Sequence, residues 1–241
     1  VVGAEAAARM NLTGEDYDGF DPTGVAGVFG ATAAAARILG LDEDQVLHAL
    51  ALAFNRCGGS FQSNVDASLA VRLIQGWVAE TGLTCALLAK SGFTGPANFL
   101  SGIYGYMHLF AGDRREASDL LADLGENYVL KTAHFKRYPS CGCTQAATEL
   151  MLNISGDADL KPDQVETIEV RLPPYSFRLV GHDFAIGDNP SVDAQFSAQY
   201  CIANALVRGA SNLDHFRAEE VGDPEVLGLV PRIKVLSDPG L

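Results

Sequence analysis

Hydrophobic residues recur at intervals of three and four along roughly the first 110 positions, which is the spacing of amphipathic helices. Gly and Ala are frequent between them, so we expect these helices to pack closely. Asp42 and Gln45 resemble a capping box at the start of one helix. Trp77 follows a glycine in another, where packing in a core is the simplest role. The pattern predicts helices over residues 25–39, 46–54, 67–90 and 96–100.

The pattern changes after residue 115. Residues 165–172 alternate with the period of two that is typical of a strand, and Pro173 and Pro174 end this run. Further helices are expected over 144–153, 194–208 and 223–229, and a second strand over 233–236. The sequence therefore predicts a mainly α fold with a smaller α+β part. We place a helical domain at residues 1–115 and an α+β domain at 116–241.

Composition limits the partners. The chain has 30 acidic and 17 basic residues and a formal net charge of −13. This charge argues against nucleic acid and anionic membranes as partners, because both would be repelled. We expect no apolar run to reach the roughly 18 to 20 residues that a membrane span requires, and five cysteines suggest reduced thiols. We expect a soluble cytoplasmic protein, and the absent initiator Met suggests a piece of something longer.

The densest group of reactive residues lies between His134 and Gln145. Lys136 or Arg137 beside the rigid Pro139 could hold a carboxylate, and Tyr138 or Lys136 could move a proton. A solvated basic loop is the alternative on composition alone.

Other standard motifs are missing from the sequence. There is no nucleotide-binding glycine fingerprint, phosphate-binding loop, serine-hydrolase elbow or zinc-protease motif. Cys141 and Cys143, separated by one residue, do not have the usual zinc spacing, so we expect buried free thiols and no metal.

Several blocks together resemble the MmgE/PrpD family, which includes 2-methylcitrate dehydratase, cis-aconitate decarboxylase and iminodisuccinate epimerase. Their order and spacing over nearly the whole chain carry the resemblance. The blocks are residues 19–30, 72–77, 82–84, 92–96, 136–141 and 193–197.

The resemblance implies a large helical domain, a smaller α+β domain and an active site in the cleft between them, usually in a homodimer. It also implies cofactor-independent chemistry on small di- or tricarboxylates, in which a proton next to a carboxylate is removed or replaced. The glycine-rich break at residues 56–62 resembles one that lines the cleft in relatives. Flexible backbone there could approach a substrate.

The departures from the family pattern concern proton transfer. Asp21, Ile74 and Gln145 stand where the family usually has histidines, and Val71 replaces a lysine. Ile74 cannot transfer a proton, whereas Asp21 could act as a base if its environment allowed it.

The resemblance and the residues together give two sets of candidate site residues. Asp21, Lys136 and Tyr138 are the candidate catalytic residues, and Arg72, Arg137, Ser140 and Gln145 are the candidate substrate-binding residues.

Two functions remain open at this point. The first is a lyase or epimerase that acts on a small polycarboxylate without a cofactor, and one or two bases suit an epimerase better than a dehydratase. The second is a non-catalytic relative that keeps the fold and serves as a binding or assembly partner.

Overall fold

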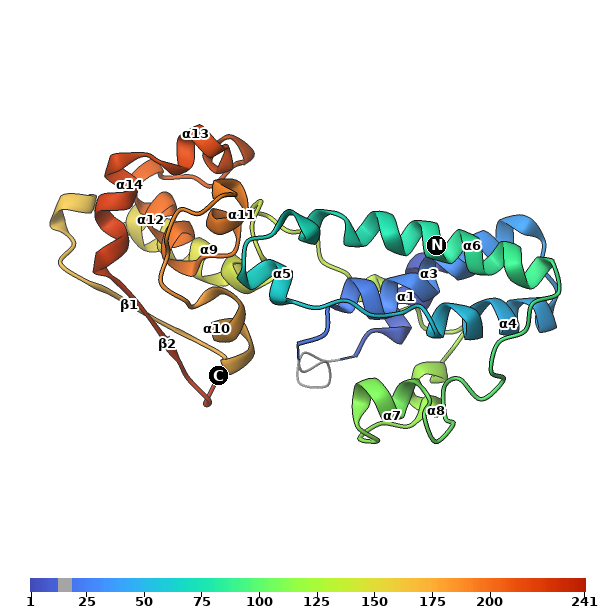
Figure 1. Ribbon diagram of the computed structural model, residues 1–241. Coiled ribbons are helices and arrows are strands. Elements are labelled where there is room, and N and C mark those ends of the chain that lie inside the picture. Colours follow the sequence, from blue (N-terminus) through green and yellow to red (C-terminus); the bar gives the residue numbers. More distant parts are fainter. Residues whose placement is uncertain (13–18) are drawn as a thin grey trace. The chain divides into compact units, whose positions relative to one another are not determined.

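The computed structural model of the chain describes residues 1–12 and 19–241. They form two compact units (Figure 1). The first unit comprises Val1–Phe61 and Arg72–Ala133, and the second comprises Gln62–Val71 and His134–Leu241. Each unit is therefore built from two separate segments of the chain.

The first unit is helical in its described residues. Its longest helices are α3 and α6, and both pack against α4. The prediction of close packing is confirmed: a Cβ on Gly30 would lie 2.4 Å from the carbonyl oxygen of Gly3, and one on Gly82 would lie 2.5 Å from the Cβ of Ala31. The elements are α1 (Val2–Met10), α3 (Pro22–Leu39), α4 (Glu43–Phe54), α6 (Ile74–Lys90), α7 (Tyr106–Ala111), α8 (Ala117–Leu121) and the 3₁₀ helix η2 (Val129–Thr132).

Helix α3 is the centre of the first unit. Its 18 residues have a mean hydropathy of 1.2, so by length and composition it could cross a membrane. The expectation that no apolar run is long enough is therefore wrong for this helix. Half of it is buried, and it contacts α1, α4 and α6, which is the arrangement of a core helix. Phe29 packs edge-on against Tyr106, whose hydroxyl donates to the carbonyl oxygen of Met10 at 2.6 Å.

The second unit is an α+β structure. It contains the segment 62–71 with α5 (Gln62–Val65) and η1 (Leu69–Arg72), the latter ending at the first residue of the other unit. The remaining elements follow His134. They are η3 (Gly142–Thr144), α9 (Gln145–Ala158), η4 (Pro162–Gln164), β1 (Ile168–Leu172), α10 (Pro174–Val180), α11 (Pro190–Gln195), α12 (Ala198–Arg208), η5 (Leu213–Phe216), α13 (Ala218–Val221), α14 (Pro224–Leu229), η6 (Val230–Arg232) and β2 (Ile233–Ser237).

The core of the second unit is organised by α12. Residues 198–206 of this helix are all buried, which identifies it as a central helix surrounded by neighbours, including α9, α14 and β2. The side chain of Gln199 bridges the loop after residue 180 and β2: Oε1 accepts from the backbone N–H of Phe184 at 2.7 Å, and Nε2 donates to the carbonyl oxygen of Ile233 at 2.8 Å.

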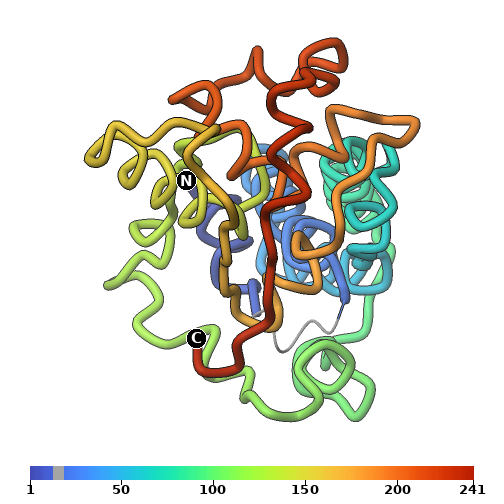
Figure 2. Tube along the Cα trace, turned by 90° about the vertical axis from the view of Figure 1, so that its left-hand side faces the viewer, coloured from blue at the N-terminus to red at the C-terminus, as the bar shows by residue number. Residues whose placement is uncertain are grey.

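Strands β1 and β2 form a two-stranded parallel sheet, with Ile168 opposite Ile233 and Leu172 opposite Ser237. The two strands run side by side in Figure 2, where β2 is the red segment before the C-terminus. Long helical connections between parallel strands are the usual topology, because a tight hairpin cannot join them.

The early segment 62–71 is attached to the second unit by polar and apolar contacts. Ala67 and Val71 form a small buried cluster with Val192, and Phe196 packs against it. The side chain of Asn189 donates to the carbonyl oxygen of Ala67 at 2.9 Å. These contacts explain why ten residues from the first half of the chain belong to the later unit.

The prediction of a mainly α fold with a smaller α+β part is confirmed. The capping box is also confirmed: Asp42 Oδ1 accepts from Gln45 N at 2.9 Å, and Gln45 Oε1 accepts from Asp42 N at 3.2 Å.

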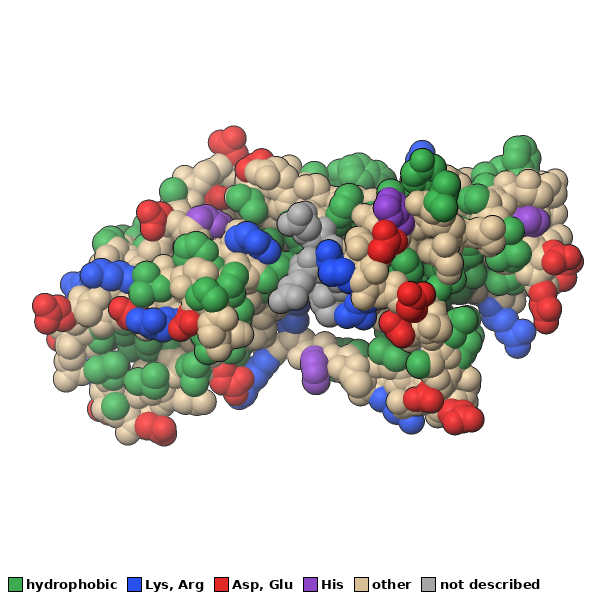
Figure 3. Space-filling view, turned by 90° about the horizontal axis from the view of Figure 1, so that it is seen from below, with side chains coloured by type: hydrophobic (Ala, Val, Ile, Leu, Met, Phe, Trp, Pro, Cys, Tyr) green, Lys and Arg blue, Asp and Glu red, His purple; other side chains and the backbone are tan. Residues whose placement is uncertain are grey.

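On the face shown in Figure 3, apolar side chains are interspersed with charged ones of both signs.

One expected helix, 67–90, begins later than predicted, and the expected helix at 96–100 does not form. Residues 67–73 do not extend α6, because Ala67 has a φ of 49° and the backbone turns into η1. The expected helix at 96–100 is a set of turns, in which Phe99 N donates to the carbonyl oxygen of Pro96. Gly95 lies too close to Ala51 for any side chain: a Cβ would be 2.6 Å from that of Ala51. Tertiary contact overrides local preference at both places.

A buried ion pair ties α1 to the loops around α8 and η2 in the first unit. Glu5 accepts from Arg9 Nε at 2.7 Å and from the backbone N–H groups of Val129 and Leu130 at 3.0 and 2.9 Å. The guanidinium of Arg9 also donates to the carbonyl oxygens of Leu120, Ala122 and Asn127. The hydrogen bond from Leu130 N, with those from Val129 and Arg9, holds the pKa of Glu5 below its ordinary value of 4.5.

We predict that Glu5→Gln lowers the stability of the protein at pH 7 and that this loss shrinks as the pH falls below about 4.5. A carboxyl group with a lowered folded-state pKa stabilises the protein above its unfolded-state pKa, and protonation removes that contribution. Urea unfolding midpoints at pH 7 and pH 4 measure the difference. Glu43→Gln, the same change at an exposed position of α4, serves as the control. An equal loss for Glu5→Gln at both pH values would contradict the assignment.

Candidate functional site

The segment from His134 to Gln145 opens the main part of the second unit, and its side chains divide into two groups. Tyr138 and Ser140 are buried, with 6% and 5% of their surface exposed, whereas Lys136 and Arg137 are exposed. A segment with a buried anchor and exposed cations differs from a freely solvated basic loop, because its backbone is fixed while its charges remain available.

Gln145, the first residue of α9, fixes this backbone. Its Oε1 accepts from Tyr138 N at 3.0 Å, and its Nε2 donates to the carbonyl oxygen of Tyr138 at 3.0 Å. The same amide nitrogen lies 3.2 Å from Ser140 Oγ and 3.3 Å from the carbonyl oxygen of Cys141. The structure therefore places the polar atoms of Gln145 on the protein's own chain, so a role as a substrate ligand would require some of these bonds to open.

Helix α11 supports the segment from the other side through Gln195. Its Nε2 donates to the carbonyl oxygen of Pro139 at 2.9 Å, and its backbone carbonyl accepts from Cys141 N at 2.9 Å. Ser140 Oγ lies 2.7 Å from Thr144 Oγ1 within the turn. Sequence reasoning noted the block at 193–197 but did not identify Gln195 as a support. The signal in the sequence that could have identified Gln195 is its position in the block 193–197, which resembles the family.

The two cations of the segment differ in their surroundings. Arg137 donates to Glu149 Oε1 at 2.5 Å, and its guanidinium lies 5.7 Å from the centre of the Tyr138 ring. Lys136 has no ion-pair partner among the residues that the structure describes. Lys136 is thus the cation more available to an anionic ligand, because the charge of Arg137 is partly neutralised.

Asp21 lies in the first unit, at the N-cap of α3. Its Oδ1 accepts from Thr23 N at 2.8 Å, and its own backbone N–H donates to the carbonyl oxygen of Gly59 at 3.1 Å. Only 7% of its surface is exposed. Pro22 at the first position and an aspartate at the cap are favourable choices for starting a helix, so Asp21 has a structural role whatever else it does.

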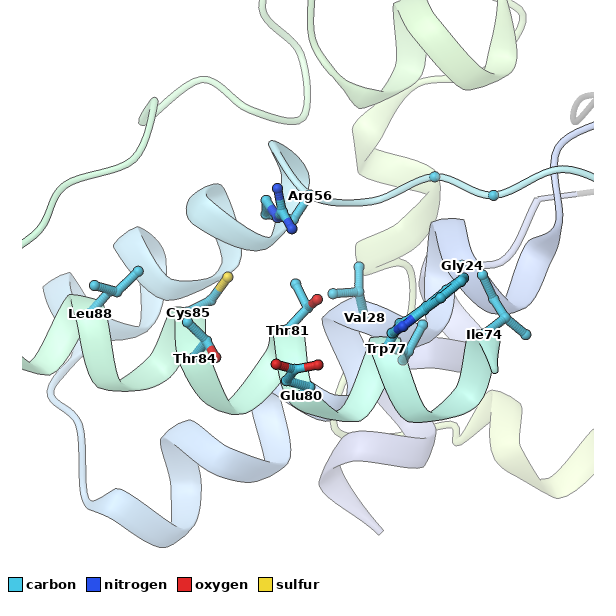
Figure 4. A pocket seen from close by; sticks show the side chains of 13 residues that line it. Gly24, Val28, Arg56, Ile74, Trp77, Glu80, Thr81, Thr84, Cys85 and Leu88 are labelled. Carbon is cyan, nitrogen blue, oxygen red and sulfur yellow. The ribbon is translucent and has the colours of Figure 1, made fainter. Parts of the chain in front are cut away.

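A cavity of about 750 Å³ lies within the first unit, between α3, α6 and the loop after α4. Figure 4 shows Trp77, Glu80, Thr81 and Thr84 projecting from α6, and Arg56 on the loop side. Its lining therefore combines an aromatic ring, hydroxyl groups and charges of both signs. Ile74, at the position where the family usually has a histidine, contributes only apolar surface.

Glycine backbone forms one wall of this cavity. Gly58 and Gly59 have φ values of 156° and 127°, in the region that favours glycine. A Cβ on Gly24 would lie 1.7 Å from the carbonyl oxygen of Gly58, so the loop rests directly on α3. The glycine-rich break thus lines a hollow within this unit, and its expected place in the cleft between the domains stays a prediction. The expectation that Trp77 is a core residue is wrong: it is 52% exposed and lines the cavity.

Cys141 and Cys143 are half-buried free cysteines, so the expectation of buried thiols is wrong for both. The hydrogen bond from Cys141 is the largest of the effects that lower the pKa of Cys143 to about 6, and the Ser176 hydroxyl and the charge of Lys136 act in the same direction. The same pairing, with burial, raises the pKa of Cys141. Among the described residues, no group of three or more His, Cys, Asp or Glu side chains could hold a metal ion.

The structure brings together some of the candidate residues and assigns others to a different unit. The candidates in one short segment of the second unit are Lys136, Arg137, Tyr138, Ser140 and Gln145. Asp21 and Arg72 belong to the first unit, where Arg72 is exposed at the end of η1.

Several known proteins are similar to this chain. Cis-aconitate decarboxylase of Homo sapiens is 24% identical over 221 residues, covering 90% of this chain and 44% of the human protein. Cis-aconitate decarboxylase of Mus musculus is 26% identical over 250 residues, covering 99% and 49%. Cis-aconitate decarboxylase-like protein oryM of Aspergillus oryzae is 25% identical, covering 96% and 51%. The chain thus spans about half the length of these curated relatives.

Two family domains match the chain in succession. The MmgE/PrpD N-terminal domain matches residues 1–118, and the MmgE/PrpD C-terminal domain matches residues 138–241. The first match contains Asp21 and the cavity, and the second begins at Tyr138 and contains Gln145, whereas Lys136 and Arg137 lie just before it. Because the two matches together cover most of the sequence, this chain belongs to the MmgE/PrpD family.

Proposed function

We propose that this chain is part of a cofactor-independent lyase that acts on a small tricarboxylate or dicarboxylate by proton transfer next to a carboxylate. The observation that carries the proposal is the fixed segment that ends at Gln145 and presents Lys136, in a chain that matches both family domains. The names of the relatives, cis-aconitate decarboxylases, favour a tricarboxylate and a lyase reaction.

Lys136 is the proposed carboxylate ligand. The net charge of −13 repels a polyanion in general, so recognition requires a local cation. A charge-assisted hydrogen bond from an ammonium group to a carboxylate is stronger than a neutral one. Arg137 would be a weaker second ligand, since binding a substrate requires it to share or leave Glu149. Ser140 and Gln145 support the segment, and Arg72 is a further candidate from the first unit.

The proton transfer needs a base or an acid. Decarboxylation of an unsaturated acid leaves an electron pair that must receive a proton, whereas epimerisation removes a proton and returns it to the other face. Asp21 can accept a proton through its carboxylate, and Tyr138 or Lys136 can donate one. The same groups would therefore serve either reaction, and release of carbon dioxide distinguishes the two.

The alternative is a binding or assembly protein without turnover. Two residues that depart from the family pattern have structural roles, and this favours the alternative. Asp21 caps α3, and Gln145 holds the segment. Ile74 has no group that can transfer a proton. Under this alternative a polycarboxylate would still bind, but it would be released unchanged.

The assembly and location are further parts of the proposal. We expect a homodimer, as the family resemblance implies, and a location in the cytoplasm, which the expectation of five reduced cysteines favours. Sedimentation equilibrium of the purified chain measures the assembly, and a monomer at all accessible concentrations would contradict it.

We predict that citrate or cis-aconitate raises the melting temperature of the protein and that Lys136→Ala weakens the affinity by at least about tenfold, the order expected for a hydrogen bond between charged groups. Titration calorimetry measures the affinity. Lys234→Ala, which removes the same charge from β2, should bind like the original chain, and Arg137→Ala should lose less affinity than Lys136→Ala. Equal losses in Lys136→Ala and Lys234→Ala would show a general charge effect and refute the assignment.

We predict that Asp21→Asn keeps the fold but slows proton exchange by about 100-fold or more, the usual contribution of a general base. Asparagine caps a helix about as well as aspartate, so stability should change little. Asp21→Ala should cost about 1 kcal/mol because the cap is lost. Nuclear magnetic resonance in deuterated water follows exchange at the carbon next to a carboxylate, and an assay for carbon dioxide follows decarboxylation.

These variants separate the two functions. Exchange or carbon dioxide release that depends on Asp21 supports the enzyme. Binding that depends on Lys136, without exchange or carbon dioxide release from any of the acids tested, supports the binding protein.

A further inference from the structure

Cys141 and Cys143 form a pair that the proposed reaction does not use. Cys85 and Cys201 are buried, whereas Cys57, Cys141 and Cys143 are half-buried. Of these three, only Cys141 and Cys143 are neighbours in a single turn, which follows Lys136 in the chain and directly precedes helix α9. The pair is therefore both accessible and adjacent to a fixed part of the protein.

The turn holds the two cysteines at a suitable separation for a disulfide. Thr144 N donates to the carbonyl oxygen of Cys141 at 3.1 Å, and residues 142–144 form a 3₁₀ helix. In a turn of this kind the Cα atoms of residues i and i+2 are about 5 Å apart. That separation falls within the range that a disulfide spans.

The surroundings of the pair favour a thiolate on Cys143. Helix α10 packs against the turn, and the neighbouring Cys141 and the hydroxyl of Ser176 from α10 both lower the pKa of Cys143. Lys136, from the preceding segment, adds a positive charge near both sulfurs. In contrast, burial raises the pKa of Cys57 to about 12 and that of Cys201 to about 11. Cys143 is thus the thiol that is most readily ionised at neutral pH.

We propose that Cys141 and Cys143 form a peroxide-sensitive dithiol, in which Cys143 attacks the peroxide and Cys141 closes a disulfide. The proposal assigns a modification site, and it does not depend on the proposed reaction with polycarboxylates. Its basis is the pair of thiols in one turn, with α10 and its Ser176 hydroxyl packed against that turn and the cation of Lys136 nearby.

The two steps balance as follows. The Cys143 thiolate attacks one oxygen of hydrogen peroxide, the O–O bond breaks, and hydroxide leaves, so that Cys143 becomes a sulfenic acid. The sulfur of Cys141 then attacks the sulfur of Cys143, the S–O bond breaks, and the departing hydroxide takes the proton of the Cys141 thiol to form water. The two sulfurs together supply two electrons to the peroxide, and added dithiol reverses the reaction.

Two effects of opposite sign set the expected reactivity. A pKa of about 6 makes Cys143 mostly thiolate at pH 7, whereas a thiol with the ordinary value of 9.0 is about 1% ionised. A less basic thiolate is also a weaker nucleophile, which cancels about 15-fold to 30-fold of this gain. The net advantage is a few-fold at pH 7, and it grows below pH 7 because an ordinary thiol loses ionisation faster.

The test uses the reduced full chain treated with hydrogen peroxide at pH 6 and pH 7. We expect the peptide that contains both cysteines to lose the mass of two hydrogen atoms, and added dithiothreitol to restore it. With Cys141→Ser, a sulfenic acid should accumulate at Cys143, where dimedone traps it. With Cys143→Ser, thiol loss from this peptide should slow at least severalfold.

Cys57→Ser is the matched control, because Cys57 is also half-buried but has a raised pKa. It should oxidise at the rate of the original chain. The mass measurement on the unaltered chain does not require any variant to fold. An unchanged mass for the peptide, or dimedone on Cys141 in preference to Cys143, would overturn the proposal.

Discussion

The hydrogen bonds of Gln145 determine the conformation on which the candidate site depends. One amide group both accepts from and donates to the backbone of Tyr138, and it also reaches Ser140 and Cys141. Tyr138 and Ser140 are buried in this attached part of the segment, and Lys136, just before them, is exposed. A histidine has one ring nitrogen to donate and one to accept in its neutral form, so it could not make all of these contacts. The residue that departs from the family pattern is therefore well suited to holding the turn.

The sequence predicts best those elements whose signal is local and repeated. Periodic apolar residues identified α3, α4 and α12, and two residues were enough to identify the capping box at Asp42. Prediction failed where a distant contact decides the conformation, as at Gly95 beside Ala51 and in the turn at Ala67. The candidate site shows the same contrast between local signals and distant contacts. Its cations form a cluster in the sequence and were predicted. The support from Gln195 and the pairing of Arg137 with Glu149 depend on residues from separate helices.

Asp21 illustrates how stability and chemistry can rest on one side chain. Its carboxylate starts the central helix of the first unit, and its backbone is bonded to the glycine loop that borders the cavity. Asp21 stands where the family usually has a histidine. Aspartate is a good helix-capping residue, and it keeps a polar group that can accept a proton at this position. A loss of activity after mutation at such a position is informative only when the cap is retained.

The two-segment composition of the second unit has a consequence for how the chain is made and divided. Residues 62–71 leave the ribosome well before His134, yet their partners Val192, Phe196 and Asn189 are synthesised much later. The segment therefore cannot form its final contacts until the rest of the first unit has been synthesised. No single cut in the chain separates the units, because a fragment that begins at His134 lacks the residues that pack against α11. The two segments of each unit are separated in the sequence by a segment of the other unit. Each unit is therefore complete only when both of its segments are present.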